Sequence, residues 1–231
     1  MKKILLLTAV AATMIFVFIS CGDDNDEPAA PENHEYVDLG LPSGTLWATC
    51  NVGATAPEEF GDHFAWGETT PKDFYDYISY KWCTGTYETM TKYCTDDSFG
   101  TIDGKNELDP EDDAAYVNWG PSWRMPTREQ IKELIELCSW EWTTRNGVYG
   151  QLGTGPNGNT LFLPAAGSRM SNSLDDTGLW GYYWSRNVDD SNTHGAYDMY
   201  FHAERVDCNS YAYGYVRYLG NSVRAVRNSR N

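Results

Sequence analysis

Short apolar runs separated by Gly, Pro and Asn dominate this sequence, and this pattern predicts short strands joined by turns. Before the middle of the chain we expect strands at residues 36–39, 45–52 and 60–67. After it we expect strands at 141–144, 148–152, 160–163, 182–184, 197–201, 211–218 and 222–226. Residues 71–107 are polar and aromatic without a clear period, which indicates a long, loop-rich insert.

Two helices are predicted in the middle of the chain. The sequence Asp-Pro-Glu-Asp at 109–112 offers an N-cap at Asp109, a proline at the first helical position and acidic residues in the first turn, with an end before Gly120. The second helix begins at Thr127, and Gln130 completes a capping box. Its apolar residues fall at i, i+3, i+4 and i+7, which predicts one buried stripe: Ile131, Leu134, Ile135 and Cys138. Helices confined to the middle of a mostly antiparallel β pattern indicate an α+β fold.

The first 20 residues have the character of a bacterial signal peptide. Lys2 and Lys3 precede an apolar run over residues 4–19, which is shorter than the ~20 residues that a membrane-spanning helix needs. The following Ser20-Cys21-Gly22 resembles a lipobox, although Phe18 stands where that pattern prefers Leu. The cysteine of a lipobox is acylated and becomes the first residue of the mature protein. We therefore expect residues 1–20 to be removed and Cys21 to carry lipid.

Residues 21–35 are acidic and contain prolines, a composition that buries little apolar surface and stays extended. We expect this segment to be a tether, followed by one domain over residues 36–229. An acidic run directly after the acylated cysteine also resembles the surface-export signal of Bacteroidetes lipoproteins. This resemblance implies an outer-membrane lipoprotein that faces outward and contacts the membrane through its lipid alone.

The charge of the chain narrows the classes of partner. Its formal net charge is −16 at pH 7, and removal of residues 1–20 makes it about two units more negative. Such a surface repels the phosphates of nucleic acids and anionic lipid headgroups. It suits cations or neutral ligands such as glycans. The 16 Tyr and 9 Trp fit either a β-rich core or a binding surface, because each ring combines an apolar face with a polar group.

Cysteines outside the cytoplasm often form disulfides. Cys83 and Cys94 flank a short segment, so we expect a local disulfide between them, worth roughly 3 kcal/mol in the chain-entropy model. Cys50 and Cys138 are the second expected pair, which leaves Cys208 as the odd thiol. The sequence contains no Cys-x-x-Cys and no His-x-x-x-His, so it does not predict a structural zinc site.

Motifs for cofactors and catalysis give little support to an enzyme. Residues 153–158 fit G-x-G-x-x-G, but a strand rather than a helix is predicted to follow, which excludes a nucleotide site. The acidic segment 96–113 offers oxygen ligands for Ca²⁺, but its spacing does not match an EF-hand loop. We favour a solvated acidic loop and no cofactor, with Ca²⁺ as the alternative. A carboxylate pair of the glycosidase type stays open, because a chain with 33 acidic residues always offers one.

The order of several segments resembles a known family. These segments are YVDLGLPSGTLWATCNVGA, WRMPTREQIKELI, TLFLPAAGSR, YYWSRN and NSVRAVR. From residue 36 to residue 227 the chain resembles the Fibrobacter succinogenes major paralogous domain family, which is common in exported Bacteroidetes lipoproteins. The resemblance implies a C-type-lectin-like fold related to the sulfatase-modifying-factor, or formylglycine-generating, domains.

The functional sites of these relatives transfer poorly to this chain. Calcium-dependent lectins of this fold use Glu-Pro-Asn or Gln-Pro-Asp, whereas residues 155–157 here are Gly-Pro-Asn and lack the carboxylate. Formylglycine-generating enzymes use two nearby cysteines before the last strand, and only Cys208 lies there. We therefore expect a binding or adhesion module for a surface glycan or protein and no enzyme activity. The alternatives are an oxidoreductase of the formylglycine-generating type and a structural subunit of a surface appendage.

The late loops are the expected place for a ligand, because loops vary on a rigid scaffold while helical stripes are used by the core. Aromatic rings there offer flat faces to sugar C–H groups, and polar neighbours supply hydrogen bonds. The residues selected on this basis are Trp180, Arg186, Asp189 and Tyr213. Trp184 belongs to the segment YYWSRN, and we expect it to be buried.

Lipidation has a direct test. Metabolic labelling of cells with a palmitate analogue is expected to tag the wild-type protein, and Cys21→Ala is expected to abolish the tag, because the lipobox cysteine is the site of acylation. An untagged wild type would contradict the assignment. Protease treatment of whole cells tests separately whether the domain faces outward.

Overall fold

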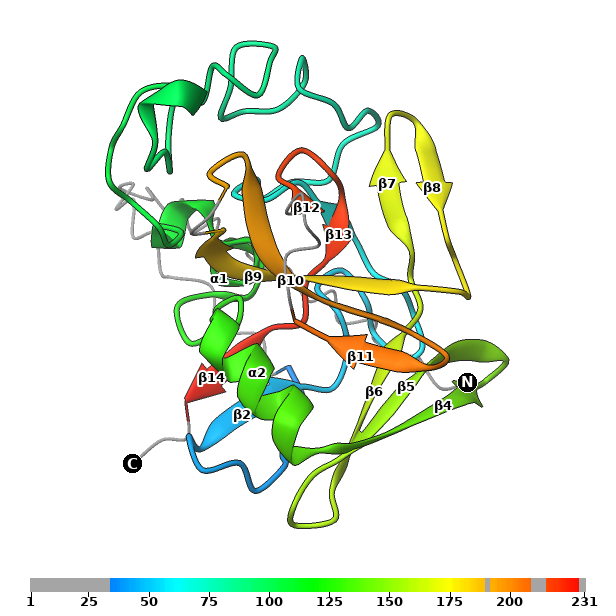
Figure 1. Ribbon diagram of the computed structural model, residues 1–231. Coiled ribbons are helices and arrows are strands. Elements are labelled where there is room, and N and C mark those ends of the chain that lie inside the picture. The colour runs from blue at the N-terminus through cyan, green and yellow to red at the C-terminus, as the bar shows by residue number, and fades with distance from the viewer. Residues whose placement is uncertain (1–33, 190–191, 209–214, 229–231) are drawn as a thin grey trace, which may run out of the picture. The chain divides into compact units, whose positions relative to one another are not determined.

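The computed structural model describes residues 34–189, 192–208 and 215–228. They belong to a compact unit, Pro31–Asn231. Cys21, the signal peptide, most of the tether and Tyr213 lie outside the described residues. Within these ranges the chain forms small, mostly antiparallel sheets and two α-helices, which confirms the α+β class (Figure 1).

The largest sheet has the strand order β11-β10-β9-β13-β3, and β12 pairs with β10 as well. Its central strands are β9 (Gly181–Val188) and β10 (Gly195–His202). The shorter strands are β3 (His63–Phe64), β11 (Arg205–Asp207), β12 (Tyr215–Val216) and β13 (Asn221–Ser222). Strand β13 runs parallel to β9, whereas the other pairs are antiparallel.

Three smaller sheets complete the β structure of the described ranges. One joins β1 (Tyr36–Asp38), β2 (Thr45–Ala48) and β14 (Val226–Asn228); another joins β4 (Ser139–Arg145), β5 (Val148–Thr154) and β6 (Thr160–Pro164). The third is the hairpin of β7 (Ser168–Met170) and β8 (Ser173–Asp175). The sequence pattern did not predict this hairpin or β11, because these short segments are largely polar. The runs at 45–52 and 60–67 form strands only over the residues given for β2 and β3.

Helix α2 (Arg128–Leu137) begins as the sequence predicts. The backbone N–H of Gln130 donates to Thr127 Oγ1 at 3.1 Å, and the N–H of Thr127 donates to Gln130 Oε1 at 2.9 Å. Ile131 and Leu134 are buried, which confirms the expected stripe. No helix in the described ranges is both long and apolar enough to cross a membrane.

The other helix begins later than predicted. A 3₁₀ turn, Pro110–Asp112, precedes α1 (Ala114–Trp119), and Asp113 rather than Asp109 is the N-cap of that helix. The Asp113 carboxylate accepts hydrogen bonds from the N–H groups of Ala115 at 2.9 Å and Tyr116 at 3.0 Å. It also accepts a hydrogen bond from the N–H of Met125, which lies beyond the helix and so outside any helical capping pattern. Asp113 therefore caps the helix and holds the following loop.

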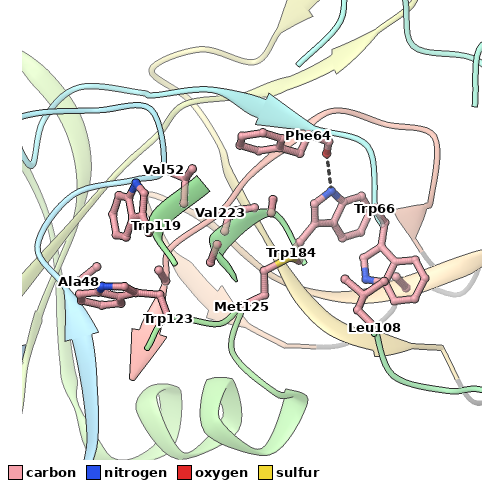
Figure 2. Packing of buried hydrophobic residues seen from close by; sticks show 14 of the residues in the cluster. Ala48, Val52, Phe64, Trp66, Leu108, Trp119, Trp123, Met125, Trp184 and Val223 are labelled. Atoms are coloured by element: carbon pink, nitrogen blue, oxygen red, sulfur yellow. Dashed lines mark hydrogen bonds between the residues drawn. The ribbon is translucent and has the colours of Figure 1, made fainter. Parts of the chain in front are cut away.

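The core lies on both faces of the β9–β10 pair. Trp184 is fully buried, as expected, and its Nε1–H donates to the Phe64 carbonyl at 2.8 Å (Figure 2). It packs in one cluster with Trp66, Trp119 and Trp123, among others. The other cluster contains residues of β2, α2, β9 and β10, including Trp47, Leu134, Tyr183 and Phe201. The long hydrophobic runs of β9 and β10 therefore serve as the centre of the domain.

The insert over residues 71–107 is loop-rich, as predicted, with one 3₁₀ turn at Asp97–Phe99. It has a small core of its own around Tyr75, Tyr80 and Met90. Arg217 ties it to the main sheet, because the buried guanidinium donates to the Tyr80 hydroxyl at 2.9 Å and to carbonyls of Lys92, Tyr93 and Thr193.

The folded part starts slightly before the expected boundary at residue 36. The His34 ring stacks on Trp119 with ring centroids 3.8 Å apart, and the Thr49 N–H donates to the Glu35 carbonyl at 3.0 Å. These contacts place His34 and Glu35 in the domain rather than in the tether.

The cap of α2 yields a stability prediction. Thr127→Ala is expected to lower the free energy of unfolding by about 1 kcal/mol, because the Gln130 N–H loses its acceptor. Thr127→Ser keeps a hydroxyl and is expected to retain most of this stability. Urea unfolding followed by circular dichroism measures both variants, and an equal loss in the two would contradict the capping role.

Candidate functional site

Three of the four residues predicted to form a ligand site lie at or near the two ends of β9. Trp180 precedes β9, whereas Arg186 lies near the end of that strand and Asp189 follows it. At about 3.3 Å per residue, Trp180 and Asp189 lie roughly 30 Å apart along the strand. Tyr213 is outside the described residues. The described members of the predicted site therefore lie in two separate regions, one at each end of β9.

The region at the end of β9 serves the fold. Asp189 is only 1% exposed, and its backbone closes the turn to β10 through hydrogen bonds with Gly195 and Asn192. The Arg186 guanidinium forms an ion pair with Glu107, with 2.8 Å between Nε and Oε1. Burial in the turn and pairing with the insert thus give Asp189 and Arg186 structural roles.

Trp180 lies at the other end, in a group of rings at the surface. Its ring is parallel to that of Tyr182, with centroids 6.0 Å apart and an interplanar angle of 3°. Its centroid is 4.4 Å from that of His202, the last residue of β10. The antiparallel pairing of β9 and β10 brings these residues together, because the start of one strand lies beside the end of the other.

A second pair of rings faces this group across a hollow. Trp142 of β4 and Tyr149 of β5 are stacked, with centroids 5.9 Å apart and an angle of 11°. The hollow has a volume of about 550 Å³. We call it the aromatic groove; its lining consists of Trp142, Tyr149, Gly178, Leu179, Trp180, His202 and Ala203.

A smaller hollow of about 220 Å³ adjoins the aromatic groove and shares Trp142 and Ala203 with it. We call it the side hollow; its lining is Ile135, Trp140, Trp142, Gln151 and residues 203–206. Figure 1 shows β11, which contains Arg205 and Val206, beside the β4–β5 hairpin. The two hollows thus lie between the β4–β5 hairpin and the turn from β10 to β11.

Gln151 connects the two walls of this region. Strand register places it opposite Trp142, and its Nε2–H donates to the His202 carbonyl at 2.8 Å. Its Oε1 is buried and has no hydrogen-bond partner among the described residues. The neighbouring pair in the register is Trp140 and Gly153, where a Cβ on Gly153 would come within 2.8 Å of the Trp140 ring. The absence of a side chain there lets the Trp140 ring lie on the sheet.

Sequence reasoning selected Trp180 but missed Trp142, Tyr149, Gln151 and His202. One signal was present, since the alternation in Trp140-Glu-Trp142 places both rings on one face of a strand. The sequence does not reveal that this face meets residues 180 and 202, because the meeting depends on how distant hairpins pack.

The acidic segment 96–113 is held by basic and hydroxyl groups. The buried Asp112 carboxylate accepts from the Tyr93 hydroxyl at 2.6 Å and lies 2.6 Å from Lys92 Nζ and 3.0 Å from Lys81 Nζ. Burial raises the pKa of Asp112, but the hydrogen bonds from Lys92, Tyr93 and Lys81 outweigh it, and the pKa lies below its usual value. Asp112 is thus a structural anion that links the insert to α1.

All five cysteines of the described ranges are free thiols, so both predicted disulfides are wrong in this structure. Cys50 and Cys138 belong to different hydrophobic clusters, on the two sides of the central sheet. Cys83 and Cys94 share a cluster, but the Sγ atoms donate to different carbonyls, those of Tyr77 and Asp96. Cys83 and Cys94 are thus packed as free thiols in the small core of the insert.

No protein-family model, curated protein or solved structure matches this chain. The chemistry of the aromatic groove follows from its own residues. Ring faces supply apolar contact, and the His202 ring and the Gln151 amide supply polar groups beside them. This combination suits a ligand that is flat and apolar on its faces and polar at its edges.

The free thiols in this structure yield a prediction about chemical labelling. The unfolded protein is treated with an alkylating reagent, once after reduction and once without it. Both samples are expected to carry the same labels, on Cys50, Cys83, Cys94, Cys138 and Cys208. In the native protein the reaction is expected to be slow, because burial raises the pKa of Cys138 to about 11 and that of Cys208 to about 12. Peptide mass spectrometry measures the labels, and a label at Cys83 and Cys94 that requires reduction would restore the disulfide.

Proposed function

We propose that this chain is a binding module displayed on the outer surface of the cell envelope, and that it binds carbohydrate in the aromatic groove. One observation carries the proposal: two stacked aromatic groups, Trp142 with Tyr149 and Trp180 with Tyr182, flank one hollow. A sugar ring has apolar C–H groups on its faces and hydroxyls at its rim. Its faces fit the rings, and its rim fits the polar groups beside them.

The polar groups at the groove match a hydroxyl-rich ligand. The Glu204 N–H donates to His202 Nδ1 at 3.3 Å, which in the neutral imidazole leaves the proton on Nε2 as a donor. The formal net charge of −16 disfavours anionic ligands. The proposed ligand is therefore a neutral glycan.

The location and the finer fold are part of the same proposal. The lipobox-like Cys21 and the acidic run after it support a lipid-anchored protein at the outer membrane. The resemblance to the Fibrobacter succinogenes major paralogous domains supports a C-type-lectin-like arrangement of the α+β domain. A tethered domain outside the cell meets glycans of its surroundings directly.

Cys208 argues against the oxidoreductase alternative. A cysteine that acts as a nucleophile without a metal does so as a thiolate, which a low pKa favours. Cys208 is buried, and this burial raises the pKa of its thiol to about 12. We therefore favour binding over catalysis.

Glycan binding is tested with the full-length chain in detergent on an array of neutral and acidic glycans. Trp180→Ala and Tyr149→Ala are each expected to weaken binding of the retained glycan about tenfold. The reason is the loss of roughly 60 Å² of apolar contact, worth ~1.5 kcal/mol at about 25 cal/mol per Å².

Phe74→Ala is the matched control, because Phe74 is 47% exposed and Tyr149 51%, and Phe74 does not line the groove. It is expected to leave affinity unchanged. Equal affinity of all three variants, or the absence of any glycan ligand, would refute carbohydrate binding in the groove. If the wild type binds a protein partner and the Trp180 and Tyr149 variants do not, the groove is assigned to a protein ligand instead.

A further inference from the structure

The two hollows adjoin each other along the β4–β5 hairpin and share Trp142 and Ala203 in their linings. Cross-strand pairing sets Trp140 opposite Gly153, Trp142 opposite Gln151 and Thr144 opposite Tyr149. Side chains of paired residues lie on the same face of a sheet, so the Trp140, Trp142 and Tyr149 rings share one face. Trp142 stands between the hollows and lines both of them.

The rings follow one another at short intervals. Trp142 and Tyr149 have centroids 5.9 Å apart, and Trp140 is two residues from Trp142 on the same strand, a step of about 6.7 Å. A row of this kind offers repeated apolar contacts along a line. It suits an extended ligand made of repeating flat units better than a single ring or a branched cluster.

Gln151 is a lining residue of the side hollow, and its side chain carries a buried acceptor that lacks a donor within the described part of the chain. Gln151 is 3% exposed, its Nε2–H is used by the His202 carbonyl, and its Oε1 has no partner among the described residues. A buried amide oxygen without a donor is costly. The oxygen is closed to solvent in this structure, so a ligand hydroxyl supplies the donor only when the amide turns toward the side hollow. A carboxylate or phosphate ligand cannot donate to it.

The charged groups at the side hollow do not favour an anionic ligand either. The guanidinium of Arg205 is engaged by the Asp207 carboxylate, and Glu204 lies next to it in the lining. The unpaired acceptor of Gln151 and the paired charges around the side hollow both favour a ligand with uncharged hydroxyl groups.

We infer that the ligand is an unbranched, neutral glycan of the β-1,4-linked glucose type, and that it crosses Trp142 and places consecutive rings in the aromatic groove and the side hollow. Equatorial hydroxyls leave both faces of each ring free to lie on an indole, whereas an axial hydroxyl would hold a face away from it. Gln151 is the specificity residue of the side hollow. The inference rests on the proposed carbohydrate binding in the groove.

The test is a length series of β-1,4-linked glucose oligosaccharides with one to six rings, titrated against the full-length chain in detergent and followed by tryptophan fluorescence. Affinity is expected to rise at least about tenfold from one ring to the length that fills both hollows, and then to level off. Glucose that binds as tightly as the hexamer overturns the two-hollow track. A branched or acidic glycan that binds while the series fails overturns the ligand class and leaves the groove proposal intact.

Substitutions separate the side hollow from the groove. Trp140→Ala and Gln151→Leu are each expected to weaken hexamer binding about three- to tenfold while affinity for the single ring stays unchanged. Ser222→Ala is the control for removal of a buried polar group, since Ser222 Oγ is also without a partner among the described residues and lies on β13 outside the track.

The melting temperature of each variant is measured beside its affinity. If Gln151→Leu weakens single-ring and hexamer binding equally, Gln151 only holds the His202 carbonyl, and the specificity role is refuted. If Trp180→Ala abolishes hexamer binding while Trp140→Ala and Gln151→Leu leave it unchanged, carbohydrate binding stands and the side hollow is excluded from the track.

Discussion

The antiparallel pairing of β9 with β10 is the constraint on which the rest of the domain depends. Nearly every residue of the two strands is buried, because one hydrophobic cluster covers each face of the pair. Trp184 and Tyr183, which are neighbours in sequence, therefore point into different clusters. The pairing also decides the surface, since it brings Trp180 at the start of β9 beside His202 at the end of β10. A shift of one residue would exchange the two faces and separate these rings.

Buried polar groups join the loops to this central pair. Arg217 fills the space between the insert and the sheet, where its guanidinium contacts the rings of Trp66, Tyr80 and Tyr93 and donates to nearby carbonyls. Delocalised charge and five donors make a guanidinium suited to such a place. Asp198, in contrast, is a fully buried acid on β10 whose oxygens have no partner among the described residues, and burial raises its pKa well above the usual value. A neutral carboxyl is the form that this environment tolerates.

The aromatic groove and the side hollow are built from segments that are far apart in the chain. The hydrogen bond from Gln151 to the His202 carbonyl links the β4–β5 hairpin to the turn after β10. Gly153 gives the Trp140 ring its place on the sheet. Rings held on strands keep their spacing better than rings on free loops, which favours a ligand with a regular repeat. The same packing explains why Asp189, selected for its position in a polar loop, serves the turn between β9 and β10 instead.

Local signals in the sequence determined the parts of this protein that need only neighbouring residues. The Thr127–Gln130 capping box, the apolar stripe of α2 and several strands follow from patterns a few residues long. The predicted N-cap of α1, Asp109, was wrong, because the observed cap, Asp113, is also held by its hydrogen bond with Met125. Only the tertiary structure decided that Trp180 lies beside His202 and shares a hollow with Trp142, far from Asp189. It alone also decided that Cys50 and Cys138 lie on opposite sides of the central sheet. These relations depend on strand order and register between segments separated by dozens of residues, and composition and periodicity carry no information about either.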